Sequence, residues 1–208
     1  ITQKHLDLAK STQKVYEEIL FHLTNLIYQK YKIENLTISG GCAMNSLANG
    51  KIIKNSKFKE IYISPSPGDA GGSIGSASTI IIKKLKKHTN VENYSYLGPE
   101  YSNEYILKII DQKKLKDKFN IQFIEYSKLY SYIANQLTNE KIVGWFQGKT
   151  EWGPRALGNR SILADPRNKN IKDIINSKIK KRENFRPFAP SILKDHVFHW
   201  FEEESSVP

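Results

Sequence analysis

Arginine occurs in only one window of the sequence, while lysine serves as the cation everywhere else. Of the 32 basic residues, the arginines are Arg155, Arg160, Arg167, Arg182 and Arg186. A planar guanidinium group can hold a phosphate or carboxylate at two points, whereas a lysine ammonium is a mobile point charge. The window therefore predicts an anion held in fixed geometry, and structural ion pairs are the alternative.

The segment QGKTEWGPRALGNRS, residues 147–161, does not have the composition of a packed core. It combines glycines and a proline with two arginines and the hydroxyl residues Thr150 and Ser161. A helix would set Arg155 and Arg160 on different faces. We therefore expect a loop in which the two guanidinium groups converge.

A helix is expected to follow this segment, because isoleucines recur there at helical spacing. They are Ile171, Ile174, Ile175 and Ile179. The same spacing leaves Asn176 and Lys180 on another face, and the dipeptide Arg186-Pro187 forces an extended exit. We expect Lys180, Arg182 and Arg186 to cluster near the end of this helix. A solvated charged face is the alternative for Lys180 and Lys181.

Two glycine turns follow short strand-like runs in the first part of the chain. The run LTIS, residues 36–39, meets Gly40-Gly41 before a helix expected at 43–48. Paired glycines let the backbone approach a ligand closely, and a helix start offers N–H groups to phosphate. A tight turn without a ligand is the alternative.

The second turn, PSPGD, follows the run at 61–63 and ends at Asp69. This position is the carboxyl end of a strand, where open α/β sheets bind ligands. The glycines around it are Gly68, Gly71, Gly72 and Gly75. They imply close approach by another group, which favours a metal-ligand or nucleotide role for Asp69. A helix N-cap is the alternative.

Cysteine and histidine offer little further chemistry. The single cysteine, Cys42, excludes an internal disulfide framework, and we expect it to be a small buried residue because no basic partner lies close in sequence. His5, His22 and His88 stand alone. We expect His196 and His199 to be surface or core residues.

Strands and helices alternate around these candidate residues, which predicts an α/β fold. The apolar spacing predicts one long amphipathic helix over the first thirty residues, ending near Lys32, and the second glycine turn opens a helix over 70–85. The lysine-rich and polar composition of residues 83–96 is typical of a linker, and it places a domain boundary near Asn93.

A second α/β or α+β unit is expected beyond this boundary. Its elements are a helix from about Ser102, a strand at 121–124, a helix from Ser127 and a strand at 141–146.

Composition limits the classes of partner. The net charge of +11 favours anions, although lysine-rich surfaces also keep proteins soluble. No run approaches the roughly 18–20 apolar residues of a membrane span, and residues 1–10 lack the profile of a signal peptide. We therefore expect a cytoplasmic protein with no membrane partner.

Three stretches resemble the O-carbamoyltransferases related to nodulation and antibiotic-tailoring enzymes. They are LTISGGCAMNSLANG at 36–50, PSPGDAGGSIGSA at 65–77, and residues 152–190, which include GPRALGNRSILADPR and KKRENFRPFAP. The resemblance covers nearly the whole chain, from the opening helix to about Leu193.

The resemblance implies a fold and a reaction for each part of the chain. Residues 1–92 would be the C-terminal part of an actin/sugar-kinase-like ATPase domain, and residues 93–208 the N-terminal part of a YrdC-like domain. In that family the YrdC-like domain makes carbamoyl adenylate from carbamoyl phosphate and ATP, with release of pyrophosphate. The ATPase-like domain then transfers the carbamoyl group to a substrate hydroxyl.

The resemblance also implies roles for single residues. Gly40, Gly41, Asn45 and Gly68 would contact nucleotide, and Asp69 would bind a divalent metal, with iron expected there and Mg²⁺ expected with ATP. The family's other metal ligands are a histidine pair, which we expect to lie before Ile1. The site for carbamoyl phosphate and ATP phosphates would contain Lys149, Arg155, Arg160, Ser161, Lys180, Arg182 and Arg186, with Arg155, Lys180 and Arg186 as catalytic residues. The family more often has arginine at the position of Lys149.

A basic RNA-binding module related to tRNA threonylcarbamoylation is the competing hypothesis, and the net charge favours it. RNA binders usually interleave aromatic residues with a basic stripe, whereas these arginines lie among glycines and prolines that suit a small anion. We therefore expect a small-molecule hydroxyl acceptor and no nucleic acid, and the sequence allows a homodimer without predicting one. We also expect the isolated chain to be inactive, because the metal-binding histidines and part of each domain would lie outside it.

Overall fold

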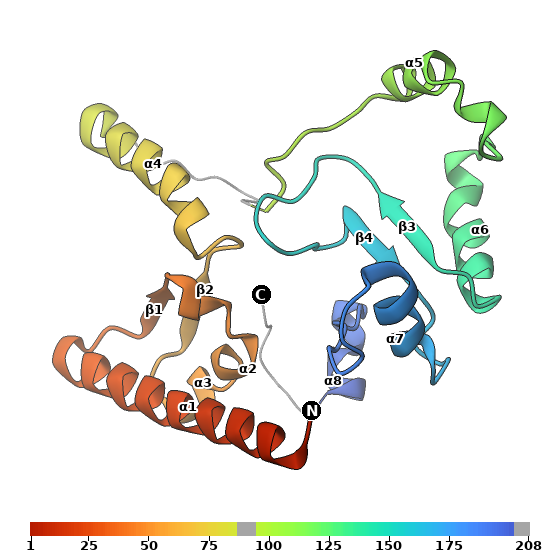
Figure 1. The fold of residues 1–208 in the computed structure, drawn as a ribbon. Helices are drawn as coiled ribbons and strands as arrows, with labels where there is room; N and C mark the ends of the chain where they lie inside the picture. The colour runs from red at the N-terminus through yellow and green to blue at the C-terminus, as the bar shows by residue number, and fades with distance from the viewer. Residues whose placement is uncertain (87–94, 202–208) are drawn as a thin grey trace. The chain divides into compact units, whose positions relative to one another are not determined.

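The computed structural model of the chain describes residues 1–86 and 95–201, which fall into two compact units (Figure 1). The first unit lies before the gap in the sequence and the second after it. The domain boundary predicted near Asn93 and the residue His88 lie outside the described residues. Each unit combines helices with a small two-stranded sheet, so the chain is mixed α/β, as predicted. The ATPase-like and YrdC-like assignments stay predictions.

Helix α1 (Gln3–Tyr31) is the longest element of the first unit, and it has the extent that its apolar spacing predicts. It begins after Thr2, whose hydroxyl lies 2.8 Å from Nδ1 of His5. It ends where Lys32 adopts a left-handed conformation with a φ of 55°. No helix of the described ranges is both long and apolar enough to cross a membrane.

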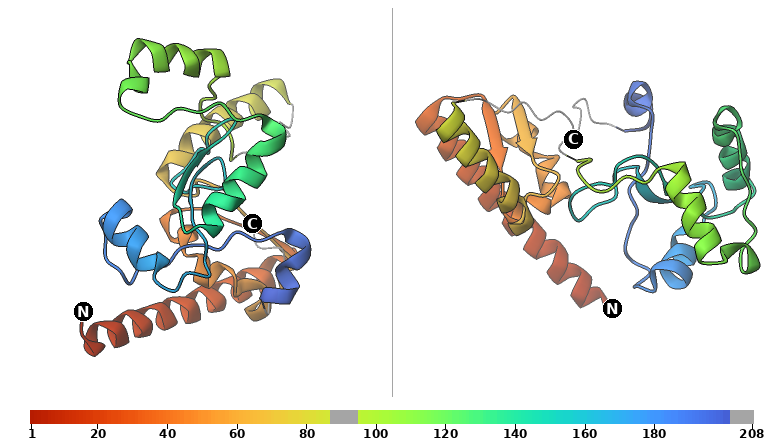
Figure 2. Two further views of the ribbon diagram at one scale, coloured as in Figure 1. Left: turned by 90° about the vertical axis from the view of Figure 1, so that its right-hand side faces the viewer. Right: turned by 90° about the horizontal axis from the view of Figure 1, so that it is seen from above.

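Strands β1 (Asn35–Ile38) and β2 (Glu60–Ile63) lie side by side (Figure 2). They pair in parallel, with Leu36 opposite Ile61. The connection between them contains the 3₁₀ turn η1 (Gly41–Met44) and the helices α2 (Ser46–Asn49) and α3 (Ile52–Asn55). The 3₁₀ turn η2 (Asp69–Gly71) and helix α4 (Gly72–Leu85) follow β2. Because the strands are parallel, the turns that follow them emerge at the same end of the sheet.

The core of the first unit holds this connection against α1. Its buried apolar residues are Ala43, Ala48, Ile52 and Phe58, each at most 4% exposed. Phe58 meets the ring of Tyr28 on α1 edge to face, with centroids 5.6 Å apart. Glu17 on α1 forms an ion pair with Lys51 at 2.8 Å. These contacts fix the segment that carries the first glycine turn.

The second unit begins with helices α5 (Asn103–Gln112) and α6 (Tyr126–Thr138), close to where the sequence predicts them. Strands β3 (Val143–Phe146) and β4 (Arg160–Leu163) pair antiparallel, with Phe146 opposite Arg160. The later elements are α7 (Ile171–Ile174), the π-helix η4 (Ile175–Lys180), the 3₁₀ turn η5 (Lys194–His196) and α8 (Val197–Trp200).

The prediction of a strand at 121–124 is wrong. These residues follow the short turn η3 (Leu115–Asp117) and form no regular secondary structure. The run is apolar, but a strand also needs a neighbour for its N–H and C=O groups. In the described chain β3 pairs only with β4, and Phe123 is 86% exposed.

Candidate functional site

The two glycine turns meet at the carboxyl end of β1 and β2. The N–H of Gly40, after β1, donates to the carbonyl of Pro67, after β2, at 2.7 Å. Gly40 has a φ of 101°, a conformation that residues with a side chain rarely adopt. The position of a Cβ on Gly68 lies 4.0 Å from Cε of Met44. The turns thus form one surface on one end of the sheet, which a shared nucleotide site needs.

The glycines of these turns differ in the space around them. A Cβ on Gly71 would lie 2.2 Å from the carbonyl oxygen of Ser66, so packing requires glycine there. A Cβ on Gly41, Gly72 or Gly75 would meet nothing within 4 Å. Packing therefore does not explain the glycine at these three positions, and they leave room for a ligand beside the backbone.

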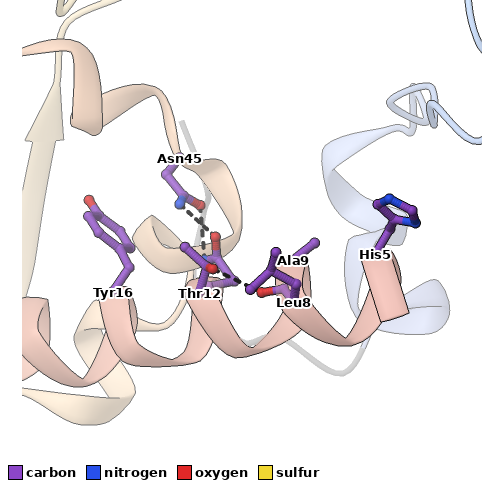
Figure 3. A pocket seen from close by; sticks show the side chains of 7 residues that line it. His5, Leu8, Ala9, Thr12, Tyr16 and Asn45 are labelled. Carbon is purple, nitrogen blue, oxygen red and sulfur yellow. Dashed lines mark hydrogen bonds between the residues drawn. The ribbon is translucent and has the colours of Figure 1, made fainter. Parts of the chain in front are cut away.

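Asn45, predicted to contact nucleotide, has its side chain engaged within the unit. Its Oδ1 accepts the N–H of Ala48 at 3.2 Å and so caps α2, and its Nδ2 donates to Oε1 of Gln13 at 2.9 Å. An open pocket of about 510 Å³ lies beside this pair along α1 (Figure 3). The residues lining it are His5, Leu8, Ala9, Thr12, Gln13, Tyr16 and Asn45. The contacts make Asn45 a residue that orders the first glycine turn.

Asp69 is exposed at the first position of η2, directly after β2 and its turn. The residue capping η2 is Gly68, so the N-cap alternative for Asp69 does not hold. Its carboxylate forms no hydrogen bond or ion pair with residues 1–86. Across both described ranges, no three His, Cys, Asp or Glu residues are grouped closely enough to hold a metal ion. Asp69 supplies one carboxylate, and the described residues form no group of three or more such ligands around it.

Cys42 is exposed, so the expectation that it is buried is wrong. The buried residue of the turn η1 is its neighbour Ala43. Adjacent residues in a helical turn face different directions, and Ala43 takes the inward position. His196 and His199 are both exposed with ring centroids 5.6 Å apart, as expected for surface histidines.

Residues 147–159 form the predicted loop, which joins β3 to β4. Its glycines all have positive φ: 53° at Gly148, 122° at Gly153 and 114° at Gly158. The base is closed by Gln147, whose N–H donates to the carbonyl of Asn159 at 3.0 Å. Arg160 and Ser161 were expected in the loop but are the first residues of β4, because they pair with β3. Arg155 is exposed within the loop.

Glu151 holds this loop from the inside, a role that the sequence analysis missed. Its side chain is 4% exposed, and its Oε1 accepts the N–H groups of Leu157 and Asn159, both at 2.7 Å, and of Arg160 at 3.2 Å. Burial alone would raise the pKa of Glu151, but the backbone N–H donors outweigh burial and lower it. Its Oε2 is buried without a hydrogen-bond partner in the described chain. The sequence carries one signal of this role: Glu151 is the single acidic residue in the run of glycines and arginines at 147–161.

The second arginine segment follows the π-helix. Asn176 lies in this helix and is fully buried. The apolar spacing placed it on a different face from the isoleucines and did not predict its burial. A π-helix has a wider turn than the α-helix that was assumed, so its side chains point in other directions. Lys181 ends the helix in a left-handed conformation with a φ of 48°, and Arg182 begins the loop that leads to Arg186.

The arginine window divides into paired and unpaired side chains. Arg167 binds both carboxylate oxygens of Asp165 and lowers the pKa of Asp165 to about 2, so the ion-pair alternative holds for this arginine. Nε of Arg186 lies 2.8 Å from a carboxylate oxygen of Glu183, and both side chains are about half exposed. Arg182 contacts Asn176.

Four predicted anion ligands keep their charged groups free. Within residues 95–201, no hydrogen bond or ion pair engages the side chains of Lys149, Arg155, Arg160 and Lys180. Ser161 Oγ accepts the N–H of Gly158 at 3.2 Å. The convergence of Arg155 and Arg186 on one anion stays a prediction.

Comparison with known proteins gives two family models that match the chain. The carbamoyltransferase N-terminus matches residues 1–78, and the carbamoyltransferase C-terminus matches residues 134–208. An uncharacterised protein of Synechocystis sp. is 40% identical over 100% of this chain and 34% of its own length. Nodulation protein NolO of Bradyrhizobium diazoefficiens is 37% identical over 97% of the chain and 36% of its own length. Nodulation protein NolNO of Sinorhizobium fredii is 36% identical over 97% of the chain and 29% of its own length. The chain thus spans about a third of the length of these relatives.

Proposed function

We propose that this chain, which belongs to the carbamoyltransferase family, is part of an ATP-dependent O-carbamoyltransferase. The observation that carries the proposal is the match of both family models, in chain order, to the first and second structural units. The acceptor we propose is a hydroxyl group of a small molecule.

The proposed reaction has two steps. Carbamoyl phosphate loses its phosphate to water, and an oxygen of the resulting carbamate attacks the α-phosphorus of ATP and expels pyrophosphate. The acceptor hydroxyl then attacks the carbamoyl carbon of carbamoyl adenylate, loses its proton, and AMP leaves with the carbon–oxygen electron pair. AMP is a good leaving group because its charge is held by a phosphate, and cationic side chains can offset that charge during transfer.

We assign the first step to residues of the second unit. Four charged side chains pair with no other described residue: Lys149, Arg155, Arg160 and Lys180. Lys149 and Arg155 lie in the loop at 147–159, and Arg160 lies where this loop joins β4. Ser161, Arg182 and Arg186 would complete the anion site. The proposed role of these groups is to hold carbamoyl phosphate and the phosphates of ATP in fixed positions. Positive φ angles and the buried Glu151 carboxylate support this role, because they define the loop that carries Arg155.

We assign the second step to the joined glycine turns of the first unit. Gly40, Gly41 and Gly68 bring bare backbone to the end of the parallel sheet, and we propose that nucleotide phosphates approach there. Asn45 would act by ordering the turn. A metal is implied by the resemblance, but the described residues supply only Asp69 for it.

Pyrophosphate release tests the proposal directly. The intact protein should release pyrophosphate from ATP only when carbamoyl phosphate is present, because carbamate is the proposed nucleophile. Release that does not depend on carbamoyl phosphate would contradict the proposed first step. Absence of release, together with RNA binding that weakens steeply with salt, would favour the competing RNA-binding function instead.

A further inference from the structure

Two large side chains of the described ranges are fully buried, Ile52 and Asn176, and Asn176 is the polar one. It lies beside the arginine-bearing segment 182–186. A buried amide must satisfy its donors and acceptor within the protein, because an unpaired polar group costs stability. Apolar packing would have served the same position at lower cost. The amide therefore has a specific task.

The contacts of Asn176 define that task. Its Oδ1 accepts a hydrogen bond from Nε of Arg182 at 2.7 Å. Its Nδ2 donates to the carbonyl of Arg186 at 2.9 Å and, more weakly, to the carbonyl of Asn184 at 3.4 Å. Its own carbonyl accepts the N–H of Arg182 at 2.9 Å. One side chain thus holds the segment at both ends.

The guanidinium group of Arg182 is fixed on three sides. Beyond the bond from Nε to Asn176, its Cζ lies 4.8 Å from the centroid of the Phe188 ring, and its Nη2 donates to the carbonyl of Pro187 at 3.4 Å. Nη1 has no hydrogen-bond partner among residues 95–201. A guanidinium held by its Nε edge and by one face presents its remaining N–H groups in one direction, which suits two-point contact with an anion.

The geometry points to Asn176 as a positioning residue that orients Arg182 and the backbone up to Arg186 for phosphate binding. This inference rests on the proposed function, since it assigns the segment to carbamoyl phosphate or to the phosphates of ATP. Asn176 lies in the π-helix η4, and π-helical turns occur often at functional sites. Asn176 itself touches no substrate.

A double-mutant cycle tests the inference by activity. We expect Asn176→Ala to raise the KM for carbamoyl phosphate about 10–100-fold, which is the usual cost of misplacing a binding group. Because Asn176 acts in part through Arg182, the double variant Asn176→Ala/Arg182→Ala should lose clearly less than the sum of the two single losses. Asn176→Asp keeps an acceptor for Arg182 Nε and should recover part of the loss. It also serves if the alanine variant does not fold. Losses that simply add would overturn the inference.

Ile175→Ala is the matched control for stability. Ile175 is the neighbouring buried residue, 5% exposed, and makes no hydrogen bond to Arg182. The Ile175→Ala variant should have a lower unfolding temperature and an unchanged KM for carbamoyl phosphate. An equal rise in KM for Ile175→Ala would assign the effect to general loosening and overturn the inference.

A spectroscopic arm separates this inference from the proposed function. In NMR spectra, Nε–H of Arg182 should exchange slowly with solvent in the wild-type protein and rapidly in Asn176→Ala. Inorganic phosphate should shift the wild-type signal and not the signal of the variant. If pyrophosphate release fails while these NMR results hold, the proposed function is wrong and the positioning role stands. If Nε–H exchanges equally in both proteins, or phosphate does not shift it, the positioning role is wrong.

Discussion

Carboxylate Oε1 of Glu151 accepts three backbone N–H groups, two from the loop that carries Arg155 and one from Arg160 at the start of β4. Hydrogen bonds to a charged acceptor are worth more than neutral ones, at about 1.5–3 kcal/mol each in favourable cases. A single buried carboxylate thus sets the path of residues 157–160. The one sign of this role in the sequence is that Glu151 is the single acid in a run of glycines and arginines.

We predict that Glu151→Gln lowers the free energy of unfolding by about 1–3 kcal/mol, because a neutral amide oxygen is a weaker acceptor for the same N–H groups. The folded protein lowers the pKa of Glu151. The carboxylate therefore stabilises the fold above the pKa of the unfolded chain, and this stabilisation is lost as the pH falls through the lower, folded pKa. Denaturant unfolding as a function of pH measures both effects, and the variant should lose less stability in acid than the wild type.

Glu125→Gln is the control for this prediction. Glu125 pairs with Lys128 at 3.1 Å on the surface, with both side chains more than half exposed. Such pairs contribute about 0–1 kcal/mol. Equal losses of stability in Glu125→Gln and Glu151→Gln would show that Glu151 does not organise the loop.

Residue roles could be predicted from the sequence only where chemistry is local. The clustering of arginine identified Arg155, Arg160 and Arg186 as candidates, but not that Arg167 would pair with Asp165 two positions away. Asn176 is buried within a π-helical turn, and Cys42 is exposed beside Ala43, which takes the inward position. Hydrophobicity of a single residue does not specify either outcome.

The turns after β1 and β2 are the elements on which the nucleotide proposal depends. Gly71 and Gly75 lie one turn apart after β2, and they have opposite surroundings: backbone of Ser66 at 2.2 Å from a Cβ on Gly71, and nothing within 4 Å of a Cβ on Gly75. The two glycines therefore form a matched pair. A methyl group added at Gly71 tests the effect of packing, and one added at Gly75 tests the effect of helix propensity.

We predict that Gly71→Ala lowers the free energy of unfolding by about 1–3 kcal/mol, since the added methyl group overlaps a backbone carbonyl that cannot move freely. Gly75→Ala should raise it by up to about 1 kcal/mol, because alanine favours the helical conformation of α4. Thermal unfolding of both variants measures the difference. A stabilised Gly71→Ala would mean that Ser66 does not lie against this glycine.

Elements with a clear apolar period were predicted well. The extents of α1, β1 and β2 follow from their sequence spacing, and Ser102 caps α5 through its side chain. The stretch at 121–124 has the same apolar character and forms no strand, because pairing depends on a neighbour that local sequence does not specify.

At the scale of the whole chain, the two units correspond to the two family models. The match to the carbamoyltransferase N-terminus ends at residue 78, within the first unit, and the match to the C-terminus starts at residue 134, within the second. Each unit has buried residues of its own: Ala48 and Ile52 in the first, Ile175 and Asn176 in the second. The proposal of one half-reaction for each unit starts from this division.

The central claim is that the second unit activates the carbamoyl group and the first transfers it. The measurement compares Arg155→Lys and Asp69→Asn in the intact protein, following pyrophosphate release and acceptor modification separately, with carbamoyl adenylate supplied ready-made for the second assay. Lysine keeps the charge of Arg155 but loses its two-point contact, so we predict at least a roughly tenfold loss of pyrophosphate release with transfer largely kept. Asp69→Asn removes the exposed carboxylate beside the glycine turns, where we place the transfer step. It should reduce acceptor modification while pyrophosphate release is largely kept. If both variants lose the same half-reaction to the same degree, the assignment of one step to each unit is wrong, and a single shared active site replaces it.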